Sequence, residues 1–158
     1  MTAVTALLDA GIKAEEIDLL IVATCTPDYL LPSTACVVQH QLGVLPHATC
    51  FDISAACSGF LYALEIAYGQ LLTGRYKCAL IVGSEKLSSI IDWSDRTTCV
   101  LFGDGAGAAV LKKVDQPGIG IIGSDLGADG AMRELLYMPA GGSRCPASPQ
   151  TIANKDHF

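Results

Sequence analysis

Three short apolar runs mark the first half of the chain, at 19–23, 49–51 and 78–82. A continuous apolar run of this length is typical of a strand covered on both faces, as in a parallel sheet. The predicted strands start near positions 19, 48 and 78, so about 30 residues separate each start from the next, the length of a βαβ unit. The pattern therefore predicts an α/β fold with a mainly parallel sheet and helices on both faces.

Helices are predicted where apolar residues recur at helical spacing between these runs. An amphipathic helix over 4–8 is expected to end at Gly11, and a second helix over 33–42 is expected to stop at Gly43. Both glycines favour the left-handed conformation that commonly ends a helix.

The second half of the chain gives a weaker pattern. We expect 83–85 to form a turn after the third strand, and further strands over 108–111 and 119–122, joined through 116–118. After Leu126 the periodicity fades, and the chain is expected to be mostly irregular.

The most apolar helical stretch runs from Cys57 to Thr73 and is expected to end at Gly74. Glu65 is its only formal charge, and apolar residues occupy almost its whole circumference. This pattern is typical of an interior helix, and the polar residues within it argue against a membrane span. We therefore expect a buried helix with Cys57 at its tip, inside the molecule.

Cys57 is the candidate nucleophile. A thiol on the first turn of a helix lies close to free backbone N–H groups and the positive end of the helix dipole, both of which favour the thiolate. Small residues at 54–56 leave room for an acyl group to approach. The alternative is a structural cysteine, since free cysteine is among the most buried residue types.

Composition limits the classes of protein and partner. The chain has 158 residues, 51% of them hydrophobic and only 16% charged, with a net charge of −6. One domain is expected, with extra surface buried against a second domain or a partner subunit. The acidic balance argues against a nucleic-acid partner, and no membrane partner is expected.

The seven cysteines are scattered, without a CxxC pair or a close histidine. Zinc sites and disulfide frameworks need tighter spacing, so no metal site is expected. An odd number of dispersed thiols, with no recognisable signal peptide after Met1, indicates reduced cysteines in a cytoplasmic protein.

The glycine-rich stretch 103–108 matches the dinucleotide-binding pattern GxGxxA, with Asp125 at a suitable distance from Gly105. That site requires a helix directly after the glycines, but here they lead into a predicted strand. We interpret the stretch as a tight turn whose backbone packs closely under the active site.

Two further segments have open interpretations. Arg96, in the stretch 92–96 with the only tryptophan, is either salt-bridged beside a helix cap or a contact for a phosphate or an aromatic ring. The apolar loop 29–32 is a candidate surface for a partner or a substrate. None of the three histidines has a catalytic context, so a papain-like hydrolase finds no support.

Several motifs together resemble one known family. They are 52–60 around Cys57, 102–108, 31–35, 94–98, 128–130 and 134–136. In these motifs, and in order over almost the whole chain, the sequence resembles β-ketoacyl-acyl-carrier-protein synthase III, a condensing enzyme that starts fatty acid synthesis. The resemblance implies a thiolase-like fold of two similar α/β halves, usually in a homodimer. It also implies acetyl-CoA or a related acyl-CoA as primer, malonyl-acyl-carrier protein as extender, and no tightly bound cofactor.

The resemblance also implies roles for individual residues. Cys57 would take the acyl group from the coenzyme A thioester, and Arg96 would pack on the coenzyme A adenine. Phe102 and Leu136 match residues that line the acyl pocket. Leu31 falls where the family places a residue, often Phe, that reaches into the partner subunit's pocket, so we expect Leu there to alter which primers fit.

The chain also departs from the family pattern. The His and Asn that the family's second half supplies are not matched, and its first strand is missing ahead of Met1. Residues 1–158 are therefore interpreted as one partial thiolase-like domain, with weak acylation and no condensation expected from this polypeptide alone. The alternatives are another thiolase-superfamily acyltransferase, such as a 3-hydroxy-3-methylglutaryl-CoA synthase or a secondary-metabolite condensing enzyme, and a non-catalytic interaction fragment.

Overall fold

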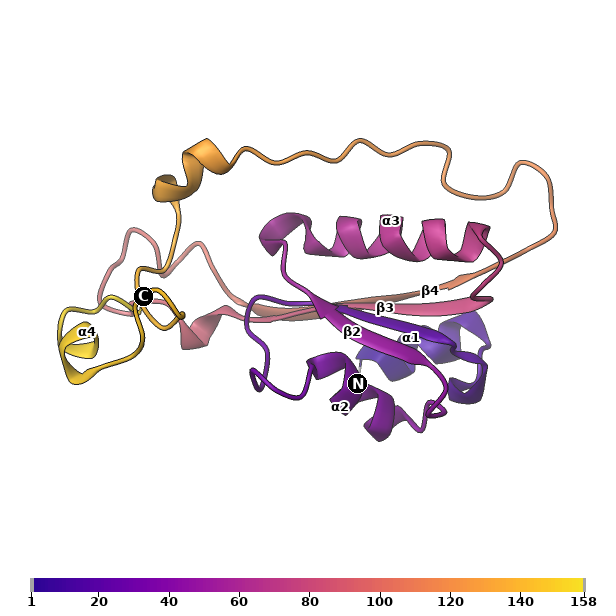
Figure 1. The fold of residues 1–158 in the computed structure, drawn as a ribbon, viewed down its shortest axis with the longest axis horizontal. Coiled ribbons are helices and arrows are strands. Elements are labelled where there is room, and N and C mark those ends of the chain that lie inside the picture. Colours follow the sequence, from indigo (N-terminus) through magenta and orange to yellow (C-terminus); the bar gives the residue numbers. More distant parts are fainter. Residues whose placement is uncertain (1, 158) are drawn as a thin grey trace. The chain divides into compact units, whose positions relative to one another are not determined.

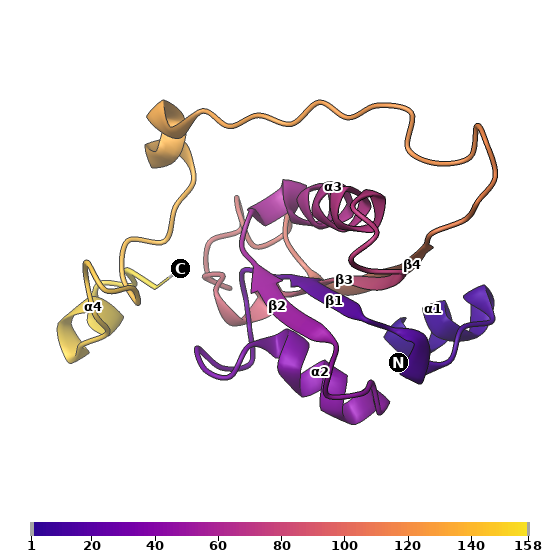
Figure 2. The same ribbon diagram turned by 45° about the vertical axis from the view of Figure 1, so that its right-hand side comes forward.

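The computed structural model describes residues 2–157, and its centre is a four-stranded sheet. The strands are β1 (Leu19–Ala23), β2 (Thr49–Ile53), β3 (Cys78–Lys86) and β4 (Asp104–Lys112). They lie side by side in the order β2-β1-β3-β4 (Figures 1 and 2). β1 pairs in parallel with both β2 and β3. The predicted mainly parallel α/β sheet is confirmed.

β4 is the exception to the parallel arrangement. The Lys113 N–H donates to the Lys77 carbonyl at 3.0 Å, beyond one end of the β3–β4 pair. At the other end the Ser88 N–H donates to the Asp104 carboxylate at 2.8 Å. β4 therefore runs antiparallel to β3.

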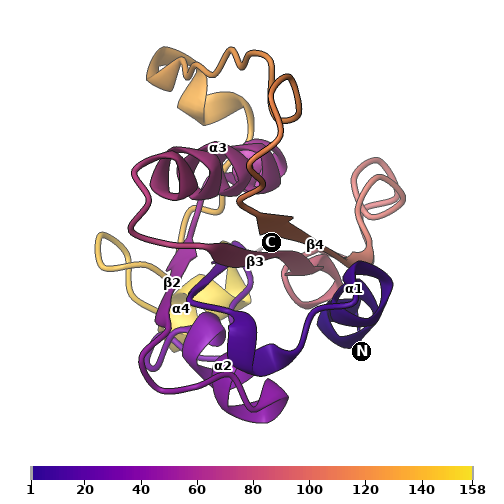
Figure 3. The ribbon, with the colours of Figure 1, turned by 90° about the vertical axis from the view of Figure 1, so that its right-hand side faces the viewer.

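Three helices cover the two faces of the sheet. α1 (Thr2–Ala10) and α2 (Thr34–Leu42) lie on one face, and α3 (Gly59–Leu72) lies on the other (Figures 1 and 3). Successive side chains of β1 point alternately to these faces. Leu20 and Val22 join the core beneath α1 and α2, whereas Leu19 and Ile21 join the core beneath α3.

The remaining helical segments are short. They are the 3₁₀ turns Ala14–Glu16, Ala56–Ser58, Leu87–Ser89 and Gly130–Leu135, and the helix α4 (Pro149–Ala153). The chain forms two compact units, one with residues up to 85 and 105–124, the other with 86–104 and 125 onward. Within residues 2–157, no helix combines the length and apolarity needed to cross a bilayer.

The predicted ends of α2 are confirmed. The Ser33 side chain accepts a hydrogen bond from the Cys36 N–H at 3.3 Å, and Gly43 takes the left-handed conformation with φ 72°. Gly74, predicted to end the helix after Cys57, likewise has φ 75°. The local signals for helix ends were therefore sufficient here.

The predicted extents of the later strands are partly wrong. The expected turn at 83–85 belongs to β3, which continues to Lys86 because β4 pairs along it. The expected strand at 119–122 does not form. A turn at 117–118 and a φ of 144° at Gly120 interrupt the extended chain there. Ile119 and Ile122 are exposed, and Ile121 is half-buried.

The glycine-rich stretch is also corrected. Gly105 and Gly107 lie within β4, not in a tight turn, and a Cβ atom at either would meet nothing within 4 Å. Close packing therefore does not explain these glycines. Because a strand and no helix follows Gly103, the argument against a dinucleotide site holds.

α3 is less buried than its composition predicts. Only a stripe of small residues with one leucine is buried, namely Gly59, Ala63, Ala67 and Leu71. Leu61 and Leu72 face outward with exposed fractions of 55% and 65%. The apolar pattern correctly indicated a helix on the sheet, but a helix that packs on one layer buries only one face.

Candidate active site

Cys57 lies on a sharp turn between β2 and α3. β2 ends at Ile53, the 3₁₀ turn Ala56–Ser58 carries the cysteine, and α3 begins at Gly59. Ala56 has φ 46°, a left-handed conformation that is unusual for a residue with a side chain. The Cys57 side chain is exposed, so the expectation of a thiol inside the molecule is wrong for this chain. The helix was also expected to begin at Cys57, two residues too early.

Two glycines let the first turn of α3 lie directly on the sheet. A Cβ atom at Gly59 would lie 3.2 Å from the Ala23 Cβ, and one at Gly83 would lie 3.3 Å from the Phe60 Cδ2. At contacts this short, a methyl group fits only if its neighbour moves by a few tenths of an ångström. The helix start beside Cys57 is therefore held against the ends of β1 and β3.

The start of α3 is electrostatically suited to an anionic ligand or intermediate. Ser58 occupies the N-cap position, and its side chain makes no capping hydrogen bond. The Ser58 and Gly59 N–H groups already donate to the Ala55 and Ala56 carbonyls, so the positive end of the α3 dipole is what favours negative charge here. Negative charge that develops on a group held beside Cys57 is therefore stabilised.

An open hollow of about 230 Å³ adjoins the thiol. We call it the Cys57 hollow. Its lining comes from the ends of β1 and β3, the start of β4 and the turn into α3: Ala23, Ala56, Cys57, Phe60, Gly83, Ser84, Glu85, Gly105, Ala106 and Gly107. Ligands of open α/β sheets bind beyond the carboxyl ends of parallel strands, and β1 and β3 end here.

Sequence reasoning did not single out most of this lining. Glu85 and Phe60 were not named as site residues, although the rule about strand ends pointed to this edge of the sheet. Their contribution depends on the β1–β3 and β3–β4 pairings, which bring segments far apart in the sequence to one place. Local signals pointed to Cys57 and to the glycine-rich stretch expected under the active site, of which Gly105, Ala106 and Gly107 line the hollow.

The other predicted site residues do not line the Cys57 hollow. Leu31 lies on the loop after β1 with an exposed fraction of 87%. Arg96, Phe102 and Leu136 belong to the second compact unit. Phe102 is half-buried, whereas Arg96 and Leu136 are exposed. None of these four residues lines the Cys57 hollow, so their roles in binding coenzyme A or the acyl group stay predictions.

The stretch around Arg96 is built from carboxylate-capped turns. In this stretch, Lys155 Nζ forms an ion pair with Asp92 Oδ2 at 2.8 Å. Arg96 forms no ion pair with any of the described residues. The Lys155 hydrogen bond, with further bonds from the Ser94 hydroxyl and N–H, lowers the pKa of Asp92 from 3.8 to about 2. Among residues 2–157, no ion pair supports the interpretation of Arg96 as a salt-bridged residue beside a helix cap.

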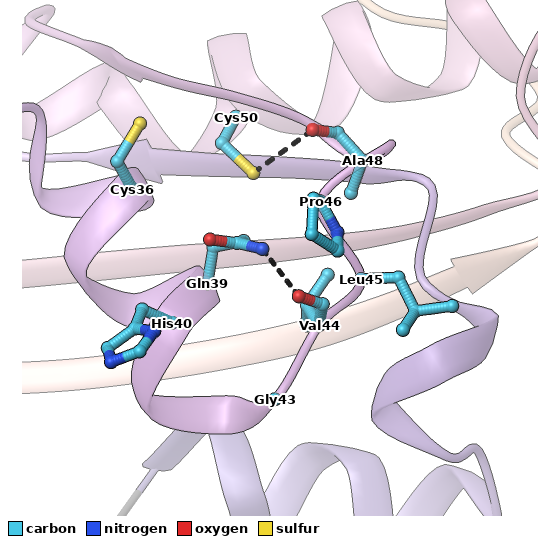
Figure 4. Close-up of a pocket in the computed structure, with 9 residues that line it drawn as sticks. All are labelled: Cys36, Gln39, His40, Gly43, Val44, Leu45, Pro46, Ala48 and Cys50. Atoms are coloured by element: carbon cyan, nitrogen blue, oxygen red, sulfur yellow. Dashed lines mark hydrogen bonds between the residues drawn. The ribbon is translucent and has the colours of Figure 1, made fainter.

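A second hollow of about 470 Å³ lies near the start of β2 (Figure 4). It lies between the end of α2 and the following loop, and both Cys36 and Cys50 line it. Burial, with a smaller contribution from Cys36, raises the pKa of the Cys50 thiol to about 11. That thiol donates to the Ala48 carbonyl at 3.6 Å and stays protonated at neutral pH. It is therefore a poor candidate for the nucleophile.

The parallel strands, the helices on both faces and the cysteine on the turn into α3 define an α/β half of the thiolase-like class. A sequence model described as 3-oxoacyl-[acyl-carrier-protein (ACP)] synthase III matches residues 51–130, about half of the chain and including the Cys57 motif. The chain belongs to this family, and the resemblance inferred from the motifs is confirmed.

Individual relatives agree with the family model. A β-ketoacyl-[acyl-carrier-protein] synthase III from Caldanaerobacter subterraneus is 58% identical over 152 residues, covering 96% of this chain and 45% of the relative. One from Desulfitobacterium hafniense is 56% identical, covering 98% of this chain and 46% of the relative. The structure of the synthase III of Thermus thermophilus matches with a TM-score of 0.80 at 44% identity, covering 93% of this chain and 44% of that one. The chain thus spans less than half the length of these relatives.

Proposed function

We propose that this chain supplies the acyl-accepting half of a β-ketoacyl-acyl-carrier-protein synthase III. In the complete reaction, an acyl group passes from acetyl-CoA or a related acyl-CoA to Cys57. Decarboxylative condensation with malonyl-acyl-carrier protein then starts a fatty acid chain. The observation that carries this proposal is the position of Cys57, which lies in the family motif, at the start of α3 and beside a hollow.

The first half-reaction needs only a nucleophile and stabilisation of an oxyanion. The Cys57 sulfur attacks the thioester carbonyl, and the resulting oxyanion is stabilised by the positively polarised start of α3. The carbon–sulfur bond to coenzyme A then breaks, and coenzyme A leaves as its thiol. One thioester replaces another, so no oxidant, metal or tightly bound cofactor is required.

The second half-reaction requires groups that this chain does not match. Family members promote decarboxylation with a His and an Asn from their second half. His40 and His47 are exposed on the α2 side of the sheet, and the His157 ring hydrogen-bonds the Thr151 hydroxyl at 2.8 Å. We therefore expect no condensation from this polypeptide alone.

Further residues and partners form part of the proposal. Arg96 contacts the coenzyme A adenine, Phe102 and Leu136 line the acyl pocket, and Leu31 reaches the pocket of a partner subunit in a homodimer. All seven cysteines are free, which supports a reducing, cytoplasmic location.

Acetyl-CoA labelling tests the proposal. The purified chain is incubated with acetyl-CoA, and peptides are mapped by mass spectrometry under conditions that preserve thioesters. We expect slow acetylation of Cys57, lost in Cys57→Ser and kept in Cys36→Ser, which removes another exposed thiol. A chain that stays unlabelled would support the non-catalytic alternative, and equal labelling of several cysteines would indicate unspecific chemistry.

A further inference from the structure

The loop that joins β1 to α2 is held by a carboxylate where it begins. The Cys25 N–H donates to Glu85 Oε1 at 2.8 Å, and the Thr26 hydroxyl donates to Glu85 Oε2 at 2.7 Å. The Cys25 sulfur also lies 3.6 Å from the Ser54 hydroxyl oxygen, on the turn that leads to Cys57. Glu85 therefore binds the start of the loop with both carboxylate oxygens.

A second carboxylate holds the loop where it ends. The N–H groups of Thr34 and Ala35 donate to Asp52 at 2.6 and 2.7 Å. These groups open α2, so the negative charge also lies at the positive end of that helix. Asp52 is on β2 and Glu85 is on β3, which are the two neighbours of β1.

The two carboxylates connect the loop to the Cys57 site. Glu85 lines the Cys57 hollow, and Asp52 lies on the strand that leads to the Cys57 turn. Between the anchors, the loop exposes the apolar side chains of Tyr29, Leu30 and Leu31. The hollow is lined by Glu85 itself and by Ala23, the residue directly before the loop, so the bonds between Glu85 and the loop also fix the Glu85 carboxylate in that lining.

We infer that Glu85 is a positioning residue: together with Asp52 it fixes the loop 24–33, and its bonds to the loop hold its own carboxylate in the lining of the Cys57 hollow. The acylation step of the proposed function then depends on the position that this anchoring gives to Glu85 and to the end of β1 in the lining of the hollow. Both oxygens of Glu85 accept hydrogen bonds from the loop, so its role is to hold the loop.

The chemistry of the partners makes the two anchors respond differently to amide substitution. At Glu85 one partner is an N–H and the other is a hydroxyl, which can also accept a hydrogen bond. Gln at position 85 can therefore keep both contacts, through its carbonyl oxygen and its NH₂ group. At Asp52 both partners are N–H donors, and the NH₂ group of Asn cannot accept from the second one.

Limited proteolysis measures the anchoring without reference to activity. Chymotrypsin cleaves after Tyr29 or Leu30 when the loop opens. We expect Glu85→Ala and Asp52→Asn each to raise the cleavage rate at this loop at least about tenfold, and Glu85→Gln to stay near the unmodified chain. Glu134→Ala, which removes an exposed surface carboxylate, is the matched control and should change nothing.

Acylation of Cys57 provides the second readout. The rate of labelling by acetyl-CoA should fall in Glu85→Ala and be largely restored in Glu85→Gln, which keeps the contacts but not the charge. An equal loss in both variants would show that charge matters and would overturn the positioning role. Circular dichroism of each variant shows whether it is folded.

The inference and the proposed function fail in distinguishable ways. If the unmodified chain is never acylated, the proposed function fails and takes the acylation part of the inference with it. The cleavage comparison still decides whether Glu85 anchors the loop. Unchanged cleavage in a folded Glu85→Ala variant would overturn the anchoring.

Discussion

At the scale of the residue, the site depends on the backbone of the turn before Cys57. Ala56 holds a left-handed conformation, which costs a residue with a Cβ about 1–2 kcal/mol. That cost is tolerated because the turn must redirect the chain from β2 into α3 within a few residues.

This strain gives the first prediction. Ala56→Val should lower the free energy of unfolding by about 1–3 kcal/mol, because a β-branched residue is poorly accommodated at positive φ. Ala56→Gly should stay within about 1 kcal/mol, since relief of strain offsets the extra entropy of the unfolded chain. Denaturant unfolding measures both, with Ala10→Val at the exposed end of α1 as control. If Ala56→Val and Ala10→Val lower the free energy of unfolding equally, the backbone at position 56 is not strained and the prediction is contradicted.

The ionised Asp92 gives a pH prediction for the second unit. The pKa of the Asp92 carboxyl is lowered from 3.8 to about 2 in the folded state. The ionised carboxylate therefore stabilises the fold at pH values above the ordinary pKa of 3.8. This contribution is lost as the pH falls toward the lowered pKa. Asp92→Asn should therefore unfold at lower urea concentration than the unmodified chain at pH 7, and the difference should shrink at acidic pH.

The neighbouring Trp93, the only tryptophan, reports on this segment by its fluorescence. The exposed Asp115, which follows β4, supplies the control Asp115→Asn, for which no such difference is expected. A difference for Asp92→Asn that persists unchanged into acid would show that charge is not its cause.

At the scale of the element, the position of α3 depends on small residues that face the sheet. Gly59 has helical dihedral angles, φ −53° and ψ −45°, so its backbone would accept alanine without strain. Space alone opposes the change, because the added Cβ would lie 3.2 Å from the Ala23 Cβ. Since that atom is fixed on β1, it cannot move away as a flexible side chain would.

Two alanine substitutions in the same helix should therefore have opposite effects. Gly59→Ala should destabilise the chain by about 1–3 kcal/mol through overpacking. Gly69→Ala should stabilise it by about 0.5–1 kcal/mol, because position 69 is exposed and a Cβ there would meet nothing within 4 Å. Thermal unfolding of both variants measures the two changes in stability. If both substitutions stabilise the chain, or both destabilise it, the described packing of α3 on the sheet is contradicted.

Elements defined by local signals were predictable, and those defined by pairing were not. The strand at 19–23 and the end of α2 at Gly43 follow from apolar runs and cap residues. The full length of β3 and the start of β4 depend on their mutual hydrogen bonds, which the sequence of either segment does not reveal. The apolar residues at 119–122 have the composition of a strand, but the turn at 117–118 and Gly120 leave them irregular.

At the scale of the whole molecule, the fold class was predictable and most of the site was not. The spacing of about 30 residues between strand starts was enough for the parallel α/β arrangement. Cys57 was singled out because a cysteine on a predicted strand-to-helix turn has a local sequence pattern. Glu85 was missed because its hydrogen bonds reach Cys25 and Thr26, far away in sequence, only after β1 and β3 pair.

The central claim is that Cys57 accepts an acyl group from a coenzyme A thioester, and the release of coenzyme A measures it most directly. Incubated with acetyl-CoA and followed by chromatography, the chain should release coenzyme A slowly, up to at most one equivalent, and Cys57→Ser should release none above background. Release that continues unchanged in Cys57→Ser, or no release from the unmodified chain, would contradict the claim.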